Sequence, residues 1–149
     1  MKERFKMVGE VHLFLLRPAP DGTDQELLMI RRFNTGFADG LYSVPAGHMD
    51  GGEEVRDAAI REAREEVGVT IEHEALRPVG VMHRNSNNER VSFFFAAERW
   101  RGEARNCEPH KCDEIGWWRL DALPADTIPY VRSAIENYQR GIWFDAHGW

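Results

Sequence analysis

The chain has 149 residues, a length typical of one domain, so we expect a single domain over residues 1–149. Hydrophobic residues make up 42% of it, which is enough for a core and argues against disorder. The formal net charge of −6 lacks the basic character of nucleic-acid-binding proteins, so no nucleic-acid partner is expected. No apolar run approaches the roughly 20 residues of a membrane-spanning helix, so no membrane partner is expected either.

The number of cysteines and the N-terminal residues indicate where in the cell the protein is expected. Cys107 and Cys112 are too few for a disulfide framework. The apolar stretch near the start is interrupted by Glu10 and His12, and no small-residue cleavage site follows it, so a signal peptide is not expected. A cytoplasmic protein is the simplest interpretation.

Apolar runs separated by turn residues predict several short strands. These strands are expected over residues 9–17, 26–32, 42–44, 79–82, 91–97 and 115–120. The first two are expected to form a hairpin around a turn at 18–22, and a glycine-containing loop at 34–40 is expected to cover a site. A polar loop is expected at 85–88.

Two helices are predicted, one from residue 52 or 53 to 68 and one over residues 129–140. Gly68 suits a left-handed helix end, and a stripe of small apolar residues suits close packing on a sheet. That stripe consists of Val55, Ala59, Ala63 and Val67. Because strands and helices mix without regular βαβ units, the sequence predicts an α/β (α+β) fold with a mixed sheet between helices.

The first predicted helix carries three glutamates on one face. Glu62, Glu65 and Glu66 stand at positions i, i+3 and i+4. A solvated acidic surface is the ordinary explanation of such a pattern. Here, however, Gly47 and the glycine pair at 51–52 bring backbone close to the acids, so a carbonyl oxygen can join the carboxylates. Such an all-oxygen ligand set favours Mg²⁺ or Mn²⁺, which would let an acidic site accept a phosphate chain.

The stretch from Gly47 to Val69 resembles the Nudix box, G-x5-E-x7-R-E-U-x-E-E-x-G-U, in which U is apolar. Every fixed position matches, at Gly47, Glu53, Arg61, Glu62, Glu65, Glu66 and Gly68. Chance agreement at so many positions is very rare, so the chain is identified as a member of the Nudix family. The elements around the box also resemble the family, which implies a Nudix-type α/β/α sandwich with a catalytic loop and helix over the whole chain.

The resemblance implies a hydrolase that cleaves a diphosphate linkage in a nucleoside diphosphate derivative, with water as the attacking group and Mg²⁺ or Mn²⁺ as cofactor. It implies that metal is held by Glu62, Glu65 and Glu66 together with the carbonyl of Gly47.

Catalytic roles are also implied for residues around these ligands. Arg61 would orient the glutamates through ion pairs, and Glu53 would support the geometry of the loop and helix or an outer metal position. The general base would be Glu65 or an acid on a later loop, for which Glu108 is the favoured candidate. A solvated loop is the competing interpretation of Glu108.

Substrate contacts outside the box are expected from Arg31, Arg32, Phe37, His83, Arg84 and Glu114. Arg31 and Arg32 would bind phosphates, and His83 and Arg84 lie where other substrate contacts are expected. Phe37 or Tyr42 would stack on a base, and Asp113 or Glu114 would hydrogen-bond a base edge. Solvated strand ends, exposed turns and, for Phe37, core packing are the competing interpretations.

The expected partner is a small-molecule nucleotide. The region after the box lacks the proline and the tyrosine typical of subfamilies that act on ADP-ribose and on diadenosine polyphosphates. A house-cleaning pyrophosphatase of (deoxy)nucleoside triphosphates is therefore the default expectation. The alternatives are a nucleotide-binding sensor without turnover and an isoprenoid diphosphate isomerase. The aromatic tail, 142–149, is expected to pack on its own domain or to form a homodimer contact.

Overall fold

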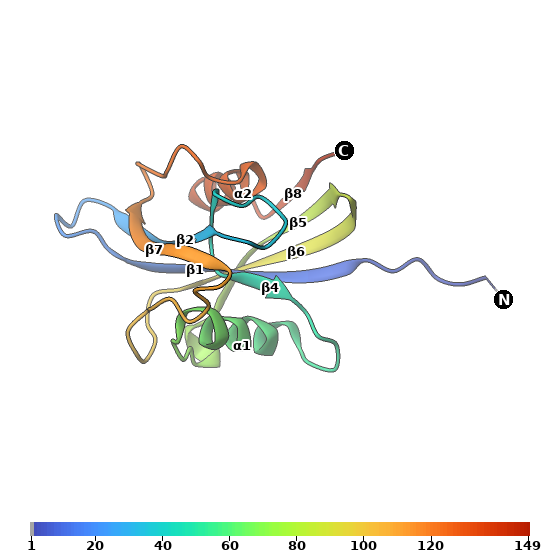
Figure 1. Cartoon of the computed structure of the whole chain (residues 1–149), viewed down its shortest axis with the longest axis horizontal. Coiled ribbons are helices and arrows are strands. Elements are labelled where there is room, and N and C mark those ends of the chain that lie inside the picture. Colours follow the sequence, from blue (N-terminus) through green and yellow to red (C-terminus); the bar gives the residue numbers. More distant parts are fainter. Residues whose placement is uncertain (1) are drawn as a thin grey trace.

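The computed structural model describes residues 2–149 as one mixed sheet between two helices. The strands run over Val8–Pro18 (β1), Gln25–Arg32 (β2), Tyr42–Ser43 (β3), Ala46–His48 (β4), Arg77–Ser86 (β5), Asn88–Ala97 (β6), Cys112–Arg119 (β7) and Phe144–His147 (β8). The helices are Val55–Val67 (α1) and Pro129–Arg140 (α2), with a 3₁₀ turn at His73–Ala75 (η1). Helices α1 and α2 cover opposite faces of the sheet (Figure 1), which confirms the predicted α/β/α sandwich.

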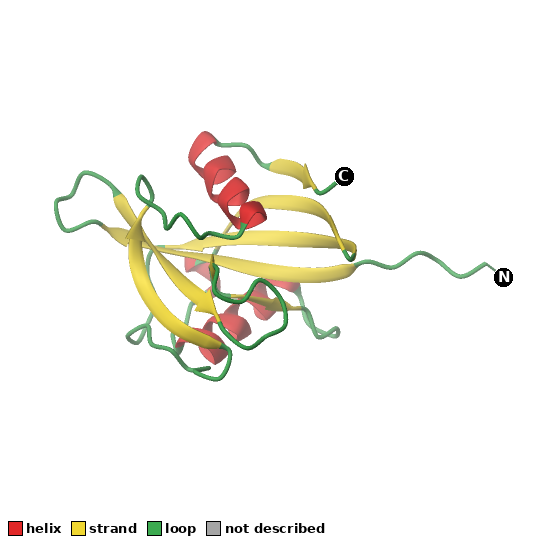
Figure 2. Ribbon diagram, turned by 45° about the horizontal axis from the view of Figure 1, so that its top comes forward, coloured by secondary structure: helices red, strands yellow, loops and turns green. Residues whose placement is uncertain are grey.

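The sheet divides where β1 and β2 separate. These strands pair only through Leu16–Pro18 and Gln25–Leu27, next to their connecting turn. Farther from the turn, β1 pairs with β4 and β6, whereas β2 pairs with β3 and β7. Figure 2 shows the two groups of strands diverging. The divergence leaves an opening between the first half of β1 and the second half of β2.

Strand β1 is buried on both faces, which explains its continuous apolar run. Successive side chains of a strand point to opposite faces. Val11, Leu13 and Leu15 accordingly pack in the core beneath α1, whereas Phe14 and Leu16 pack in the core beneath α2. Strand β1 therefore joins both layers and sets the position of the opening relative to each helix.

Helix α1 begins at Val55, later than the predicted start at residue 52 or 53. Gly51 and Gly52 have φ values of 82° and 71°, which are left-handed and cannot continue a right-handed helix. Glu54 caps the helix, since its side chain accepts a hydrogen bond from the Arg56 amide. The predicted end is confirmed, because Gly68 has a φ of 74° and closes the last turn.

Several strands differ from the sequence predictions. Strands β5 and β6 extend into the region predicted as a polar loop, and Asn87 turns between them with a φ of 63°. Strand β7 begins at Cys112, before the predicted start at 115. The short strands β4 and β8 were not predicted, because three or four residues give too little alternation to recognise.

The C-terminal tail packs on its own domain, which is one of the two arrangements expected from the sequence. Strand β8 pairs in parallel with β5, and the indole N–H of Trp149 donates to the His83 carbonyl at 3.1 Å. Within residues 2–149, no helix has the length and apolar character needed to span a membrane.

The contact between α1 and β1 gives a test of the packing. Ala63 is fully buried there, so Ala63→Leu would force the helix away from the sheet. We expect the free energy of unfolding to fall by about 1–3 kcal/mol, measured by urea denaturation. Arg64→Leu adds the same side chain at the exposed neighbouring position and should change stability little. Equal losses in the two variants would contradict this account of the packing.

Candidate active site

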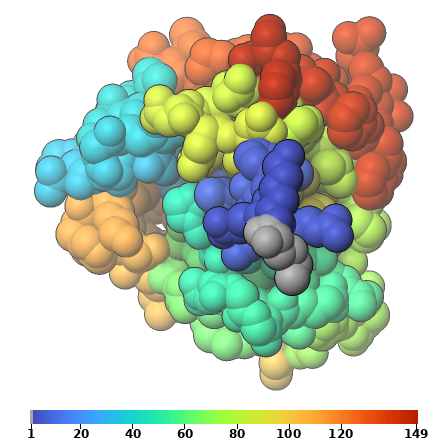
Figure 3. Space-filling model, turned by 90° about the vertical axis from the view of Figure 1, so that its right-hand side faces the viewer, coloured from blue at the N-terminus to red at the C-terminus, as the bar shows by residue number. Residues whose placement is uncertain are grey.

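A cleft of about 790 Å³ lies where β1 and β2 separate. Glu10 and His12 of β1 line one side of it, and Ile30 and Arg32 of β2 line another. The remaining lining comes from loop 34–40, β3, β4, α1, the hairpin of β5 and β6, loop 106–112, β7 and α2. Figure 3 shows the surface hollowed between loops 34–40 and 106–112. The volume of the cleft falls within the range of roughly 300–1,000 Å³ that is typical of small-molecule sites.

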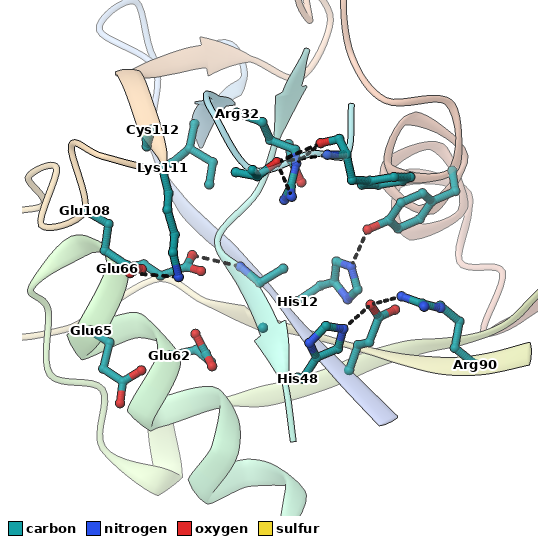
Figure 4. Close-up of a pocket in the computed structure, with 18 of the residues that line it drawn as sticks. His12, Arg32, His48, Glu62, Glu65, Glu66, Arg90, Glu108, Lys111 and Cys112 are labelled. Carbon is teal, nitrogen blue, oxygen red and sulfur yellow. Dashed lines mark hydrogen bonds and ion pairs between the residues drawn. The ribbon is translucent and has the colours of Figure 1, made fainter. Parts of the chain in front are cut away.

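One end of the cleft is acidic. Figure 4 shows carboxylates from α1 and from loop 106–112 at this end, namely those of Glu62, Glu65, Glu66 and Glu108. Glu62 is buried, with 8% of its surface exposed. The carboxylate of Glu66 accepts a hydrogen bond from the Ala46 amide at 3.0 Å, which ties the helix to β4. The structure thus brings together the glutamates that the sequence placed on one helix face.

Gly47 lies directly against this acidic end. A Cβ at residue 47 would overlap the carboxylate of Glu62. Strand β4 can therefore approach α1 this closely only with glycine at that position, and the approach places backbone polar groups beside the glutamates. The fixed spacing between Gly47 and Glu62 in the sequence thus corresponds to a direct contact between the two residues in the fold.

Arg61 holds the acidic residues in place. Its guanidinium donates to Glu53 at 2.8 Å, to Glu62 at 2.9 Å and to Glu65 at 3.2 Å. It also donates to the His48 carbonyl at 3.2 Å, which connects α1 to β4. Hydrogen bonding to Arg61 lowers the pKa of Glu53. Glu53 itself does not line the cleft, and it contacts residues that do through Arg61 and the Asp50 amide.

Loop 106–112 and the residue before it are attached to the end of α1 by backbone hydrogen bonds. The amide of Arg105 donates to the Val67 carbonyl, and the amide of Cys107 donates to the Glu66 carbonyl, each at 3.0 Å. These bonds satisfy carbonyls that the helix end leaves free. They also place Glu108 near Glu66, close enough for the charge of Glu108 to raise the pKa of Glu66.

Burial and mutual repulsion make the charges of this cluster costly. Burial raises the pKa of Glu62 to about 7, against the opposing effect of Arg61. Burial also raises the pKa of Glu66 well above its usual range, and the charges of Glu62 and Glu108 add to the effect. At neutral pH the negative charges of the cluster are therefore not fully compensated, and a bound cation would compensate them.

The donor atoms at this end suit a divalent metal by their chemistry. Carboxylate and carbonyl oxygens are the ligands preferred by Mg²⁺ and Mn²⁺. In the part of the chain described, however, no three His, Cys, Asp or Glu side chains already enclose a metal position. Glu65 is half-exposed and paired with Arg61, so its carboxylate would have to turn toward the cleft to join the others. The residues fit a metal after side-chain rotation.

Three of the side chains expected to contact substrate line the cleft: Arg32, Phe37 and Arg84. Phe37 is exposed on loop 34–40, and its carbonyl accepts a hydrogen bond from Arg32 at 2.7 Å. Arg84 is almost fully buried, donates to Glu10 at 2.7 Å, and lies 3.5 Å over the ring of Tyr130. Arg84 therefore belongs to the wall of the cleft, with its charge already paired.

The other three, Arg31, His83 and Glu114, lie outside the cleft, which corrects their predicted position. Arg31 points away from its neighbour Arg32, as alternation along β2 requires, and pairs with Asp113 at 2.8 Å. Glu114 accepts a hydrogen bond from the Tyr42 hydroxyl at 2.7 Å. His83 packs on Trp149, with ring centroids 4.7 Å apart.

Sequence reasoning missed a polar network at the other end of the cleft. Glu10 is buried and accepts from Arg84 at 2.7 Å and from Arg90 at 2.8 Å. Nearby, Nε2 of His12 lies 2.9 Å from the Tyr130 hydroxyl. Burial lowers the pKa of His12 to about 4, so its ring is neutral at physiological pH. The available signal was the interruption of an apolar strand by two polar residues.

The raised pKa of Glu62 gives a stability test. Its pKa is about 7 in the folded protein and 4.5 in an unfolded chain, so its stabilising contribution is complete below pH 4.5 and lost as the pH rises through 7. His12, whose pKa is lowered to about 4, gives an opposing rise in stability over the same range, so the effect of Glu62 is the difference between the wild-type protein and Glu62→Gln. In urea denaturation with a chelator, we expect the wild-type protein to lose as much as about 3 kcal/mol of unfolding free energy relative to Glu62→Gln as the pH rises from 4.5 through 7. Equal slopes in both proteins would contradict the assignment. Burial opposes the charge of Glu10, but His12 and then Arg84 and Arg90 lower the pKa of that residue to about 2, so its stabilising contribution is lost only as the pH falls from 4.5 toward 2.

Known proteins are similar to this chain in sequence and in fold. The NUDIX domain family model matches residues 16–138. The NAD-capped RNA hydrolase NudC of Stutzerimonas stutzeri is 36% identical over 114 residues, which cover 76% of this chain and 38% of that protein. The chain thus spans less than two fifths of the length of that relative. The 8-oxo-dGTP diphosphatase of Escherichia coli is 28% identical over 71% of this chain and 79% of its own length.

A solved structure agrees with these sequence matches. The MutT NUDIX hydrolase from Burkholderia pseudomallei is 26% identical and superimposes with a TM-score of 0.76, covering 89% of this chain and 98% of that one. A family model that spans most of the chain and a matching fold together support the interpretation of residues 47–69 as a Nudix box. The chain belongs to the Nudix family.

Proposed function

We propose that the protein is a divalent-metal-dependent pyrophosphohydrolase that cleaves a diphosphate linkage in a nucleoside diphosphate derivative. The observation that carries the proposal is the acidic end of the cleft, where buried Glu62 lies beside Gly47, Glu66 accepts a hydrogen bond from the Ala46 amide, and Glu65 and Glu108 complete the lining. In this proposal Glu62, Glu65, Glu66 and the Gly47 carbonyl hold Mg²⁺ or Mn²⁺. The metal would offset the charge of the phosphate chain and stabilise charge that develops on phosphorus.

The other residues of the acidic end have supporting roles in the proposal. Arg61 keeps the carboxylates in position, and Glu53 orients Arg61 through two hydrogen bonds, of 2.8 and 3.2 Å. Glu65 and Glu108 are the two candidates for the base that takes a proton from the attacking water. Both are more exposed than Glu62, which gives them access to that water.

A (deoxy)nucleoside triphosphate is the first substrate that we propose, with Phe37 available to stack on its base. The names of the relatives add an NAD-capped RNA and 8-oxo-dGTP as substrates to be tested. The absence of a nucleic-acid partner therefore stays a prediction, as do a cytoplasmic location and a homodimer.

Two other functions remain to be tested against hydrolysis. A nucleotide sensor without turnover would bind the same compounds and release no product. An isoprenoid diphosphate isomerase would need a reactive cysteine near the diphosphate. Cys112 does line the cleft, but burial raises the pKa of its thiol, which donates to the Glu114 carbonyl at 3.1 Å.

Glu66→Gln tests the proposed activity. The amide can still accept the hydrogen bond from Ala46, so the fold should survive while a metal ligand loses its charge. We expect kcat to fall about 100-fold or more. Phosphate or pyrophosphate release would be measured with Mg²⁺ and with Mn²⁺. The panel holds nucleoside triphosphates, 8-oxo-dGTP, ADP-ribose, nucleotide sugars, coenzyme A, dinucleotide polyphosphates, an NAD-capped RNA and isopentenyl diphosphate.

Glu136→Gln is the matched control, because Glu136 is exposed on α2 and lies outside the cleft. This variant should retain full activity. Binding of a panel compound by the wild-type protein without any product would replace the hydrolase proposal with the sensor.

Gly47→Ala tests the proposed metal position. The added Cβ would displace the carboxylate of Glu62, so affinity for Mn²⁺ should fall about 10- to 100-fold, measured by titration calorimetry. Gly116→Ala is a matched control, because a Cβ there makes only ordinary contact, at 3.8 Å from Trp118. Unchanged Mn²⁺ affinity in Gly47→Ala would place the metal elsewhere.

A further inference from the structure

Five Lys and Arg side chains line the cleft, and they differ in how fully their charges are paired. Arg61 is surrounded by carboxylates of the acidic end. Arg84 and Arg90 share the carboxylate of Glu10 at 2.7 and 2.8 Å. The remaining two are Arg32 and Lys111, which have no such close ion pair among the described residues.

Arg32 and Lys111 belong to segments that are joined directly. The amide of Phe33 donates to the Lys111 carbonyl at 2.9 Å, which fixes loop 106–112 to the end of β2. Arg32 donates to the Phe37 carbonyl and to the Thr35 hydroxyl, both neutral acceptors that leave its charge unbalanced. Nζ of Lys111 lies 3.8 Å from a Glu108 oxygen, too far for a strong hydrogen bond.

The backbone under Lys111 is fixed, although its side chain is 60% exposed. The side-chain amide of Asn106 donates to the Cys112 carbonyl at 2.7 Å, and its oxygen accepts from the Glu108 amide at 3.0 Å. The Lys111 amide also donates to the Glu108 carbonyl at 2.9 Å. Figure 4 shows the Lys111 side chain extending along one side of the cleft to the carboxylates of Glu66 and Glu108. A long cationic side chain thus projects from a rigid base into the cleft.

We propose that Lys111 binds the phosphate chain of the substrate, with Arg32 as its neighbour on the same wall. This inference rests on the proposed function, since it adds a cation to the acidic end of the same cleft. A phosphate chain beside four glutamates is repelled by them, and the ammonium of Lys111, 3.8 Å from Glu108, brings positive charge to that place. An ammonium group with three donors and only a weak partner can bind phosphate oxygens with little loss of existing contacts.

Direct binding tests this role without requiring turnover. Inorganic pyrophosphate with Mg²⁺ is the probe, and titration calorimetry measures its Kd for the wild-type protein, Lys111→Ala and Lys111→Arg. We expect Kd to rise about tenfold or more in Lys111→Ala and to be partly restored in Lys111→Arg. Lys6→Ala removes a lysine that lies outside the cleft and should leave Kd unchanged. An unchanged Kd in Lys111→Ala, or no binding by the wild-type protein, would overturn the proposal.

Kinetics on a substrate from the panel gives a second measurement. Because Lys111 is proposed to bind phosphates rather than to transfer protons, its loss should raise KM about tenfold and change kcat much less. A fall in kcat with unchanged KM would contradict the role.

Chemical labelling adds a test that needs no substitution. The chain has three lysines, Lys2, Lys6 and Lys111, so an amine-acetylating reagent followed by mass spectrometry reports on each one. Pyrophosphate with Mg²⁺ should slow acetylation of Lys111 several-fold and leave Lys2 and Lys6 unaffected. Equal rates at Lys111 with and without pyrophosphate would overturn the proposal. Protection of Lys111 in a protein that hydrolyses nothing on the panel would support this inference and refute the hydrolase.

Discussion

Mutual repulsion between closely spaced carboxylates is the constraint on which this cleft depends. Arg61 relieves it within the protein, because one guanidinium bonds Glu53, Glu62 and Glu65 at once. The relief is incomplete, since burial still raises the pKa of Glu62 to about 7. A bound cation would reduce the remaining repulsion between these carboxylates. The stability of the metal-free protein and its proposed activity therefore depend on the same few groups.

The fold supplies this site through the separation of β1 from β2. Each strand keeps its own partners after the short paired region, so the opening costs neither strand its backbone hydrogen bonds. Its lining then carries both signs of charge. Helix α1 and loop 106–112 contribute the glutamates, whereas Arg32 donates to neutral acceptors and Lys111 makes a 3.8 Å contact with Glu108. A ligand with a phosphate chain and a divalent metal would match this distribution better than a neutral ligand would.

The sequence predicted the structure best where function restricts the spacing of nearby residues. The α/β/α arrangement, the left-handed end of α1 at Gly68 and the gathering of Glu62, Glu65 and Glu66 are all present in the structure. It failed where partners are distant in sequence. His83 points to the tail because β8 lies beside β5, and Arg31 faces Asp113 because β2 pairs with β7. Neither pairing leaves a local signal, and neither does the burial of Arg84 against Glu10.

The most direct test of the central claim is to locate the metal itself. Crystals soaked with Mn²⁺ and measured for its anomalous scattering would show where the ion binds. The account predicts one strong peak or more within bonding distance of the Glu62 and Glu66 carboxylates and the Gly47 carbonyl. The absence of any peak at these oxygens, in crystals that bind Mn²⁺ elsewhere or not at all, would contradict it.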